Sequence, residues 1–286
     1  MGQQIVSGLS AGASYALLAL ALVITMKTTK IPNFAMASMG LVPTYCIWWL
    51  ITKFQAPYAL ALAAGLVVAF AVGWAIERTA IRGLAARSEF ATVVMTIGLW
   101  FAINPLVVLL FGFDAHPFVP PYAGALHVGS VVVSYSAIVA LLLSVVVAGL
   151  LRVFFGTRIG IEMKAVAESA PTARLLGVGV GTISGLAWGI ASLVAMLAVL
   201  LNVHDTVLHP GSGDSLIING FVAATAGGFT SVAGAIIGGL VLGVIETLTA
   251  GYISSAAGST ITLIVIMAIL LARPRGLVGE AAERAL

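Results

Sequence analysis

Long apolar segments recur along the whole chain, and they restrict the possible folds more than any other feature. A helix that crosses a bilayer needs about 20 mostly apolar residues. Segments of this kind fall at 5–26, 33–51, 57–76, 91–112, 131–151, 179–201, 216–227, 232–250 and 259–272. The seventh is too short to cross alone. We therefore expect an all-α polytopic membrane protein with about eight transmembrane helices and one short or broken segment.

The composition supports lipid as the solvent of this chain. Of its 286 residues, 61% are hydrophobic and 8% are charged, whereas soluble proteins carry about 25% charged residues. The net charge of +3 comes from few residues, so a nucleic-acid partner is not expected. No soluble segment interrupts the apolar ones, and residues 1–286 are interpreted as a single transmembrane domain. The N-terminus lacks a basic stretch, so it is not interpreted as a cleaved signal peptide.

The short segment 216–227 has the length of a half-helix. Transporters use such broken helices near the middle of the membrane, and the segment is expected either to cross in extended form or to be re-entrant. The next segment holds glycines four residues apart, which let helix backbones approach closely in lipid. These are Gly234 with Gly238 and Gly239 with Gly243. Tight helix packing is the favoured interpretation, and a role in shaping a pathway is the alternative.

Basic residues predict the orientation, because the cytoplasmic loops of membrane proteins are rich in lysine and arginine. With the N-terminus outside and the C-terminus inside, twelve of the thirteen basic residues lie inside, and only Lys53 lies outside. The twelve are Lys27, Lys30, Arg78, Arg82, Arg87, Arg152, Arg158, Lys164, Arg174, Arg273, Arg275 and Arg284. This count requires that segment 216–227 crosses the membrane.

Sequence motifs for catalysis are absent, so no enzyme and no cofactor is expected. None of the four lysines has a glycine five residues before it, which excludes a phosphate-binding loop for ATP. No H-E-x-x-H, C-x-x-C or G-x-S-x-G motif occurs either. One outer loop gathers His204, Asp205, His209 and Asp214. They are interpreted as a solvated loop rather than as a metal site.

A few polar residues fall within or beside the apolar segments and are the candidates for a solute pathway. Unpaired polar groups in hydrocarbon cost several kcal/mol, so each needs a partner or a polar route. Glu246 is the one acid placed well inside a segment, and such charges are often functional. The candidate pathway residues are Ser14, Asn33, Thr96, Asn219 and Glu246. Their alternative role is hydrogen bonding between helices, and Asn33 is also placed to cap a helix start.

The longest inner loop contains a segment with helix signals, AVAESAPTARLLG at 165–177. Alanine and leucine favour helix, Pro171 suits a first helical turn, and Gly177 suits a helix end. Two short helices with a break near Ser169 are therefore expected. Leu175 and Leu176 make the second helix apolar at its end, which suits either a groove in a soluble partner or the lipid surface.

These segments, taken in order, resemble the permeases of branched-chain amino acid ABC importers over nearly the whole length. The likeness is carried by SYALLALALVIT (14–25), Asn33-Phe34-Ala35, Glu77-Arg78 with Arg82, Thr96-Ile97-Gly98, TRIGIEMKAVAESAPTARLLG (157–177), GGFTSVAGAIIGGLVLGVIE (227–246) and RPRGLVG (273–279). The chain departs from the family pattern at Met36-Ala37-Ser38, at Asn219-Gly220 and at Gly177-Val178-Gly179. The first two departures fall near the expected pathway and bear on the identity of the solute.

The resemblance implies a type II importer permease in a bacterial inner membrane. It implies a second permease subunit, generally non-identical, two cytoplasmic ATP-binding subunits and a periplasmic or extracellular solute-binding protein. It also implies that 157–177 is the ATPase-coupling loop, with Lys164, Ala165, Glu168, Pro171, Arg174, Leu175, Leu176 and Gly177 as its candidate contacts. The expected cargo is a branched-chain or other small amino acid. The alternatives are a passive channel for a small neutral solute such as urea or an amide, a lipid-acting membrane enzyme and a secondary transporter.

Overall fold

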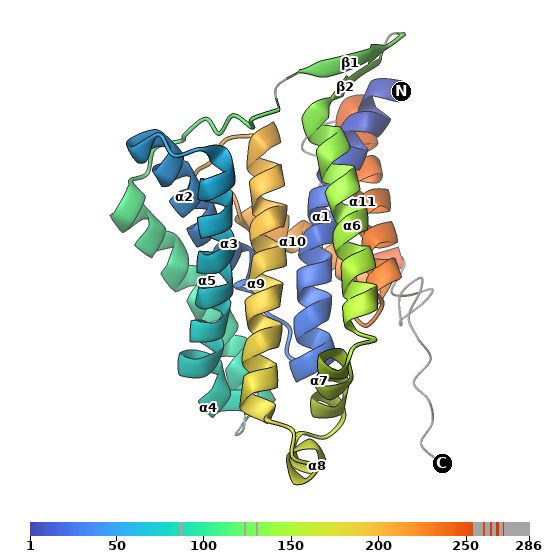
Figure 1. The fold of residues 1–286 in the computed structure, drawn as a ribbon. Coiled ribbons are helices and arrows are strands. Elements are labelled where there is room, and N and C mark those ends of the chain that lie inside the picture. Colours follow the sequence, from blue (N-terminus) through green and yellow to red (C-terminus); the bar gives the residue numbers. More distant parts are fainter. Residues whose placement is uncertain are drawn as a thin grey trace.

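The computed structural model describes residues 1–85, 88–122, 124–129 and 131–253, together with the single residues 260, 264, 267, 268 and 271. Its long helices are α1 (Gly2–Thr29), α2 (Met36–Phe54), α3 (Tyr58–Ile76), α5 (Glu89–Phe111), α6 (Tyr135–Phe154), α9 (Val180–Asp205), α10 (Asp214–Gly227) and α11 (Val232–Tyr252). The helices α1, α3, α6 and α9 run lengthwise beside one another in a single bundle, and α10 lies across it behind them (Figure 1).

The two ends of the bundle carry different short elements (Figure 1). One end carries α7 (Arg158–Glu168) and α8 (Ala170–Leu175). The other end carries the N-terminus and an antiparallel hairpin of β1 (Ala125–Val128) and β2 (Val131–Ser134). The basic residues of α1, α6 and α7 lie at the α7–α8 end, where Lys27, Arg152 and Lys164 line one cavity.

Six helices of the described residues are long and apolar enough to cross a membrane, namely α1, α3 with its continuation to Ala85, α5, α6, α9 and α11. They correspond to six of the eight expected spans. The expected span 33–51 is the helix α2, which has 19 residues but is not among these six. Most of the last expected span, 259–272, lies outside the described residues.

The expected span 131–151 is wrong at its start. Residues 131–134 pair with 125–128 as a strand, and α6 begins only at Tyr135. The side chain of Ser134 accepts a hydrogen bond from the backbone N–H of Ala137 and so caps the helix there. The run of valines that looks like membrane helix is therefore part of a small hairpin at the end of the bundle, an element that the all-α expectation did not include.

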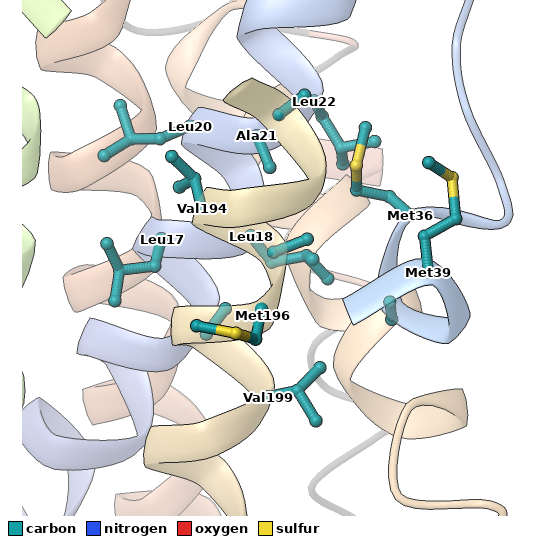
Figure 2. Close-up of a cluster of buried hydrophobic side chains, with 14 of the residues drawn as sticks. Leu17, Leu18, Leu20, Ala21, Leu22, Met36, Met39, Val194, Met196 and Val199 are labelled. Carbon is teal, nitrogen blue, oxygen red and sulfur yellow. The ribbon is translucent and has the colours of Figure 1, made fainter. Parts of the chain in front are cut away.

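The core of the bundle is formed by α1 and α9 with the first turn of α2. Most of α1 is enclosed by other helices, whereas most of α3 and α5 is exposed on the outside of this single chain. Figure 2 shows side chains of all three core helices converging, with Leu18 and Leu22 on α1, Met36 on α2 and Val194 on α9. These four side chains are buried. Because α1 lies at the centre, it is in a position to orient its neighbours.

The two glycine pairs of α11 serve two different neighbours. Gly239 and Gly243 face α1, where an added Cβ at Gly12 would lie 2.8 Å from the carbonyl oxygen of Gly239. Gly234 and Gly238 face α10, and their closest neighbours there are backbone atoms of Gly227 and Ala223. The glycine spacing thus produces tight packing on two sides of α11, as predicted. As a result, α10 and α1 are held against the same helix.

Arg82 links the continuation of α3 to α9 near the α7–α8 end. Beyond Ile76 the helix widens into the π-helical segment η1 (Glu77–Ile81) and continues as α4 (Arg82–Ala85). Arg82 donates to the carboxylate of Glu77 at 2.6 Å and to the carbonyl oxygen of Gly181 at 2.7 Å. Glu77 is almost wholly buried. The arginine therefore satisfies a buried carboxylate and the first turn of a neighbouring helix at once.

The glycine contacts generate a stability prediction. In Gly243→Ala the new methyl would meet backbone atoms of Gly8 and Gly12 on α1, which cannot move aside as a flexible side chain can. We expect a loss of about 1–3 kcal/mol, the usual cost of overpacking, seen as a lower melting temperature in detergent. Gly149→Ala on α6 is the matched control, because nothing lies within 4 Å of its new methyl. Equal melting temperatures for the two variants would contradict the packing.

Candidate substrate pathway

Two helices begin inside the bundle rather than at its surface. After α1 the chain passes through residues 30–35 to the start of α2, and after α9 it passes through residues 206–213 to the start of α10. The two starts touch, since a Cβ added to Gly213 would lie 3.3 Å from the Cβ of Ala37. With 14 residues, α10 is about 21 Å long and is shorter than the hydrocarbon core. It is the short segment expected from the sequence, extended by two residues at its start.

The carboxylate of Asp214 is the centre of a polar cluster at these helix starts. Its Oδ1 accepts hydrogen bonds from the indole Nε1 of Trp100 at 2.8 Å and from the amide Nδ2 of Asn104 at 3.0 Å. The amide oxygen of Asn104 accepts in turn from the hydroxyl of Ser38 at 3.1 Å. The cluster therefore links α10, α5 and α2 through side chains that lie far apart in the sequence.

This arrangement corrects the interpretation of Asp214 as part of a solvated outer loop with His204, Asp205 and His209. Asp214 is in the first turn of α10, while His204 lies among the rings of Tyr58, Phe118 and Tyr122. Asp205 accepts hydrogen bonds from Ser10 and Ser136 at 2.7 and 2.8 Å, which ties α9 to α1 and α6. Within the described residues, no group of histidine, cysteine and acidic side chains is arranged to hold a metal.

Two hollows flank the Asp214 cluster. The larger, of about 760 Å³, is bordered by α5, by the loop before α10 and by Asp214 itself. Its lining residues are Asn104, Pro105, Val108, Phe113, Ala115, His209, Pro210, Gly211 and Asp214. The second, of about 270 Å³, lies further along α10 and is apolar, with Phe34 stacked on Phe221 at a centroid distance of 4.5 Å. Trp100 lines this second hollow and binds Asp214 of the first, so the two hollows follow one face of the chain.

Asn33 and Thr96 lie behind this face, and neither residue lines either hollow. Both are wholly buried. The Oδ1 of Asn33 accepts from the N–H of Ala35 at 2.9 Å, and the Oγ1 of Thr96 accepts from the N–H of Phe34 at 3.3 Å. Both side chains satisfy backbone N–H groups in the turn that precedes α2. This role is similar to the helix-capping role expected for Asn33. Their contribution to the site is to position Phe34.

Asn219, Glu246 and Ser14 lie on the other side of α10. The amide of Asn219 donates to Oε2 of Glu246 at 3.2 Å. Asn219 and Ser14 are buried, and Glu246 is half-buried. These residues join α10 to α11 and α1, and they do not border either hollow. For Asn219 and Glu246 the structure gives the interhelical hydrogen bond that was their alternative interpretation.

The residues that the sequence did not indicate are Trp100, Asn104 and the Phe34–Phe221 pair, and Asp214 was expected only in an outer loop. One available signal was the four-residue spacing of Trp100 and Asn104, which places both on one face of a helix. The three-residue spacing of Ser215, Ile218 and Phe221 gives a second signal, because it also places these residues on one face of a helix. Neither pattern reveals its partner on the other helix.

The two expected inner helices are present at the end of the bundle opposite the hairpin (Figure 1). α7 contains Lys164, Ala165 and Glu168, and the break falls at Ser169, whose side chain caps α8 by accepting from the N–H of Thr172. Pro171 is in the first turn of α8 and Arg174 in its last. Gly177 has a φ of +83°, a conformation that favours glycine. Leu175 is 88% exposed and Leu176 77% exposed, so their apolar side chains have no cover within the described chain.

Comparison with known proteins agrees with this architecture. The family model described as the permease component of a branched-chain amino acid transport system matches residues 4–272. The chain is 31% identical to the high-affinity branched-chain amino acid transport system permease protein BraD of Pseudomonas aeruginosa, over 97% of this chain and 95% of that protein. It is 27% identical, over the same shares, to the permease protein LivH of Escherichia coli. The chain therefore belongs to the family of branched-chain amino acid transport system permease components.

Proposed function

We propose that this chain is the membrane permease subunit of an ATP-driven importer for branched-chain or other small amino acids. Its partners are a second permease subunit, two ATP-binding subunits on the cytoplasmic side and a solute-binding protein on the other side. The observation that carries the proposal is the pair of exposed leucines at the end of α8, at the basic end of the bundle. The names of the matched relatives, which are transport system permeases, support the same class.

The solute pathway in this proposal follows the face made by the starts of α2 and α10 and by α5. This face carries both hollows and the exposed side chain of Ile218. α5 also presents large apolar side chains, including Phe101 and Leu109, which are exposed in the single chain. A second permease packed against this face would cover them and close the hollows. Movement of α7–α8 with the ATPase would then open the pathway alternately to each side.

The passive-channel alternative is not retained. A channel needs no coupling segment, whereas this chain keeps two well-capped helices with uncovered leucines at one end. A secondary transporter would need an ion-coupled acid, and Glu246 already accepts a hydrogen bond from Asn219. We assign no enzymatic role, since the family is one of transport permeases.

The proposed orientation places the N-terminus outside and the C-terminus in the cytoplasm of a bacterial inner membrane. Lys27, Arg152 and Lys164 lie together at the α7–α8 end, and cytoplasmic ends of membrane proteins are rich in such residues. The hairpin β1–β2 would then face outside.

Coupling through α8 is tested with Leu175→Asp/Leu176→Asp. Two carboxylates at the apolar end of α8 should prevent docking in a groove of the ATPase, so amino acid uptake by the reconstituted importer should fall at least tenfold. The melting temperature of the isolated permease should stay the same, because both side chains are exposed. Val119→Asp is the control, since Val119 is 73% exposed in the loop at the opposite end. Normal uptake by the double variant would refute the docking assignment.

Orientation is tested with single cysteines, which the chain permits because Cys46 is its only natural cysteine. In a Cys46→Ser background, His127→Cys in β1 should react with a membrane-impermeant maleimide added to intact cells. Leu176→Cys should react only after the cells are opened. The reverse pattern of labelling would overturn the proposed topology.

A further inference from the structure

The carboxylate of Asp214 is held by hydrogen bonds from neutral side chains and is not paired with a cation of the described residues. Its two hydrogen-bond donors, Trp100 and Asn104, are both neutral, and both bind the same oxygen, Oδ1. Within the described residues, no lysine, arginine or histidine forms an ion pair with it. Ionisable groups inside a membrane are costly and are usually paired with an opposite charge or serve a function.

Helix capping does not account for Asp214 either. The N-cap position of α10 is Gly213, and no side chain caps this helix. The bonds of Asp214 go instead to α5, across 114 and 110 positions of the sequence. The carboxylate is thus held by its neighbours in one fixed orientation while its charge is left without a cation.

The second oxygen, Oδ2, lies beside the larger hollow. It is next to Gly211, where an added Cβ would lie 3.3 Å from it, and both residues line that hollow. The absent side chain of Gly211 leaves this approach open. His209 is also at the rim, and its Nδ1 accepts from the N–H of Gly211 at 3.1 Å. This bond leaves the Nε2 of a neutral ring to carry the proton, so the imidazole supplies a hydrogen-bond donor and no positive charge.

The remaining wall of the hollow is apolar. Pro105, Val108 and Phe113 of α5 and the following loop face it together with Ala115. One fixed anionic oxygen on an otherwise apolar wall matches a small molecule that has one cationic group and a short hydrocarbon part. An aliphatic amino acid has both.

We propose that Asp214 is the subsite that binds the ammonium group of the transported solute. This inference rests on the proposed function, and it names the chemical group of the solute that the permease recognises. Oδ2 accepts from the ammonium, Trp100 and Asn104 hold the carboxylate in place through Oδ1, and the apolar wall covers the aliphatic part. The solute then supplies the cation that the chain itself does not provide.

The test measures binding to the full-length permease in nanodiscs, without ATPase or solute-binding protein, by the tryptophan emission of the protein. The probes are 3-methylbutylamine, which keeps the ammonium and the aliphatic part of leucine, and 4-methylpentanoate, which lacks the ammonium. We expect saturable binding of the amine alone. Because Trp100 is bonded to Asp214, its emission should report the occupied site, and Trp100→Phe should remove the signal.

Asp214→Asn is the decisive variant. The amide keeps the shape of the carboxylate and an oxygen for Trp100 and Asn104, but it removes the charge. Its half-saturating amine concentration should rise at least tenfold, whereas Asp205→Asn, which removes a carboxylate at the end of α9, should leave it unchanged. No saturable amine binding to the unchanged protein, or equal binding to the Asp214→Asn variant, would overturn the inference. Amino acid uptake by the complete importer is measured separately and tests the proposed function. A failure of the Asp214 subsite can therefore be distinguished from a failure of the proposed transport function.

Discussion

The interior of a lipid bilayer offers no hydrogen bonds, so a chain that is interrupted there must satisfy its own polar groups. Within the described residues, two non-helical segments interrupt the bundle, one before α2 and one before α10, and Asn33, Thr96 and Asp214 lie at or near these interruptions. Asn33 and Thr96 bind the backbone of the first interruption. Ser38, Trp100 and Asn104 surround the second through the carboxylate of Asp214. The candidate pathway is therefore placed where the fold already requires polar residues.

Close helix packing holds these interruptions in position. α11 approaches α1 through Gly239 and Gly243, and it approaches α10 through Gly234 and Gly238. Asn219 also bonds α10 to α11, through the carboxylate of Glu246. The short helix α10 is thus fixed against α11 by glycine contacts and a partly buried hydrogen bond. Its other side, with Asp214 and Ile218, remains free to face a solute or a second subunit.

Much of the fold was predictable from the sequence because its signals are local. Runs of about 20 apolar residues predict helices that cross the membrane, and the helix signals with a break near Ser169 predict the pair α7–α8, which the structure contains. The start of α6 was not predictable, since Val131–Ser134 is as apolar as a membrane helix and becomes a strand only by pairing with Ala125–Val128. The site was largely missed for a related reason: the bond between Trp100 and Asp214 joins residues 114 positions apart, and neither residue alone indicates the other.

Whether the side of α10 that carries Asp214 and Ile218 lines the solute pathway can be tested directly by measuring the accessibility of a cysteine placed there. In a Cys46→Ser background, Ile218→Cys on α10 is compared with Leu142→Cys on α6, because the two positions are 52% and 62% exposed in the single chain. The assembled importer is treated with a positively charged, water-borne methanethiosulfonate, and amino acid uptake is then measured. We expect uptake to be lost only with Ile218→Cys, since that thiol faces an aqueous route while Leu142→Cys faces lipid. Full uptake after treatment of Ile218→Cys, or equal loss in both variants, would contradict it.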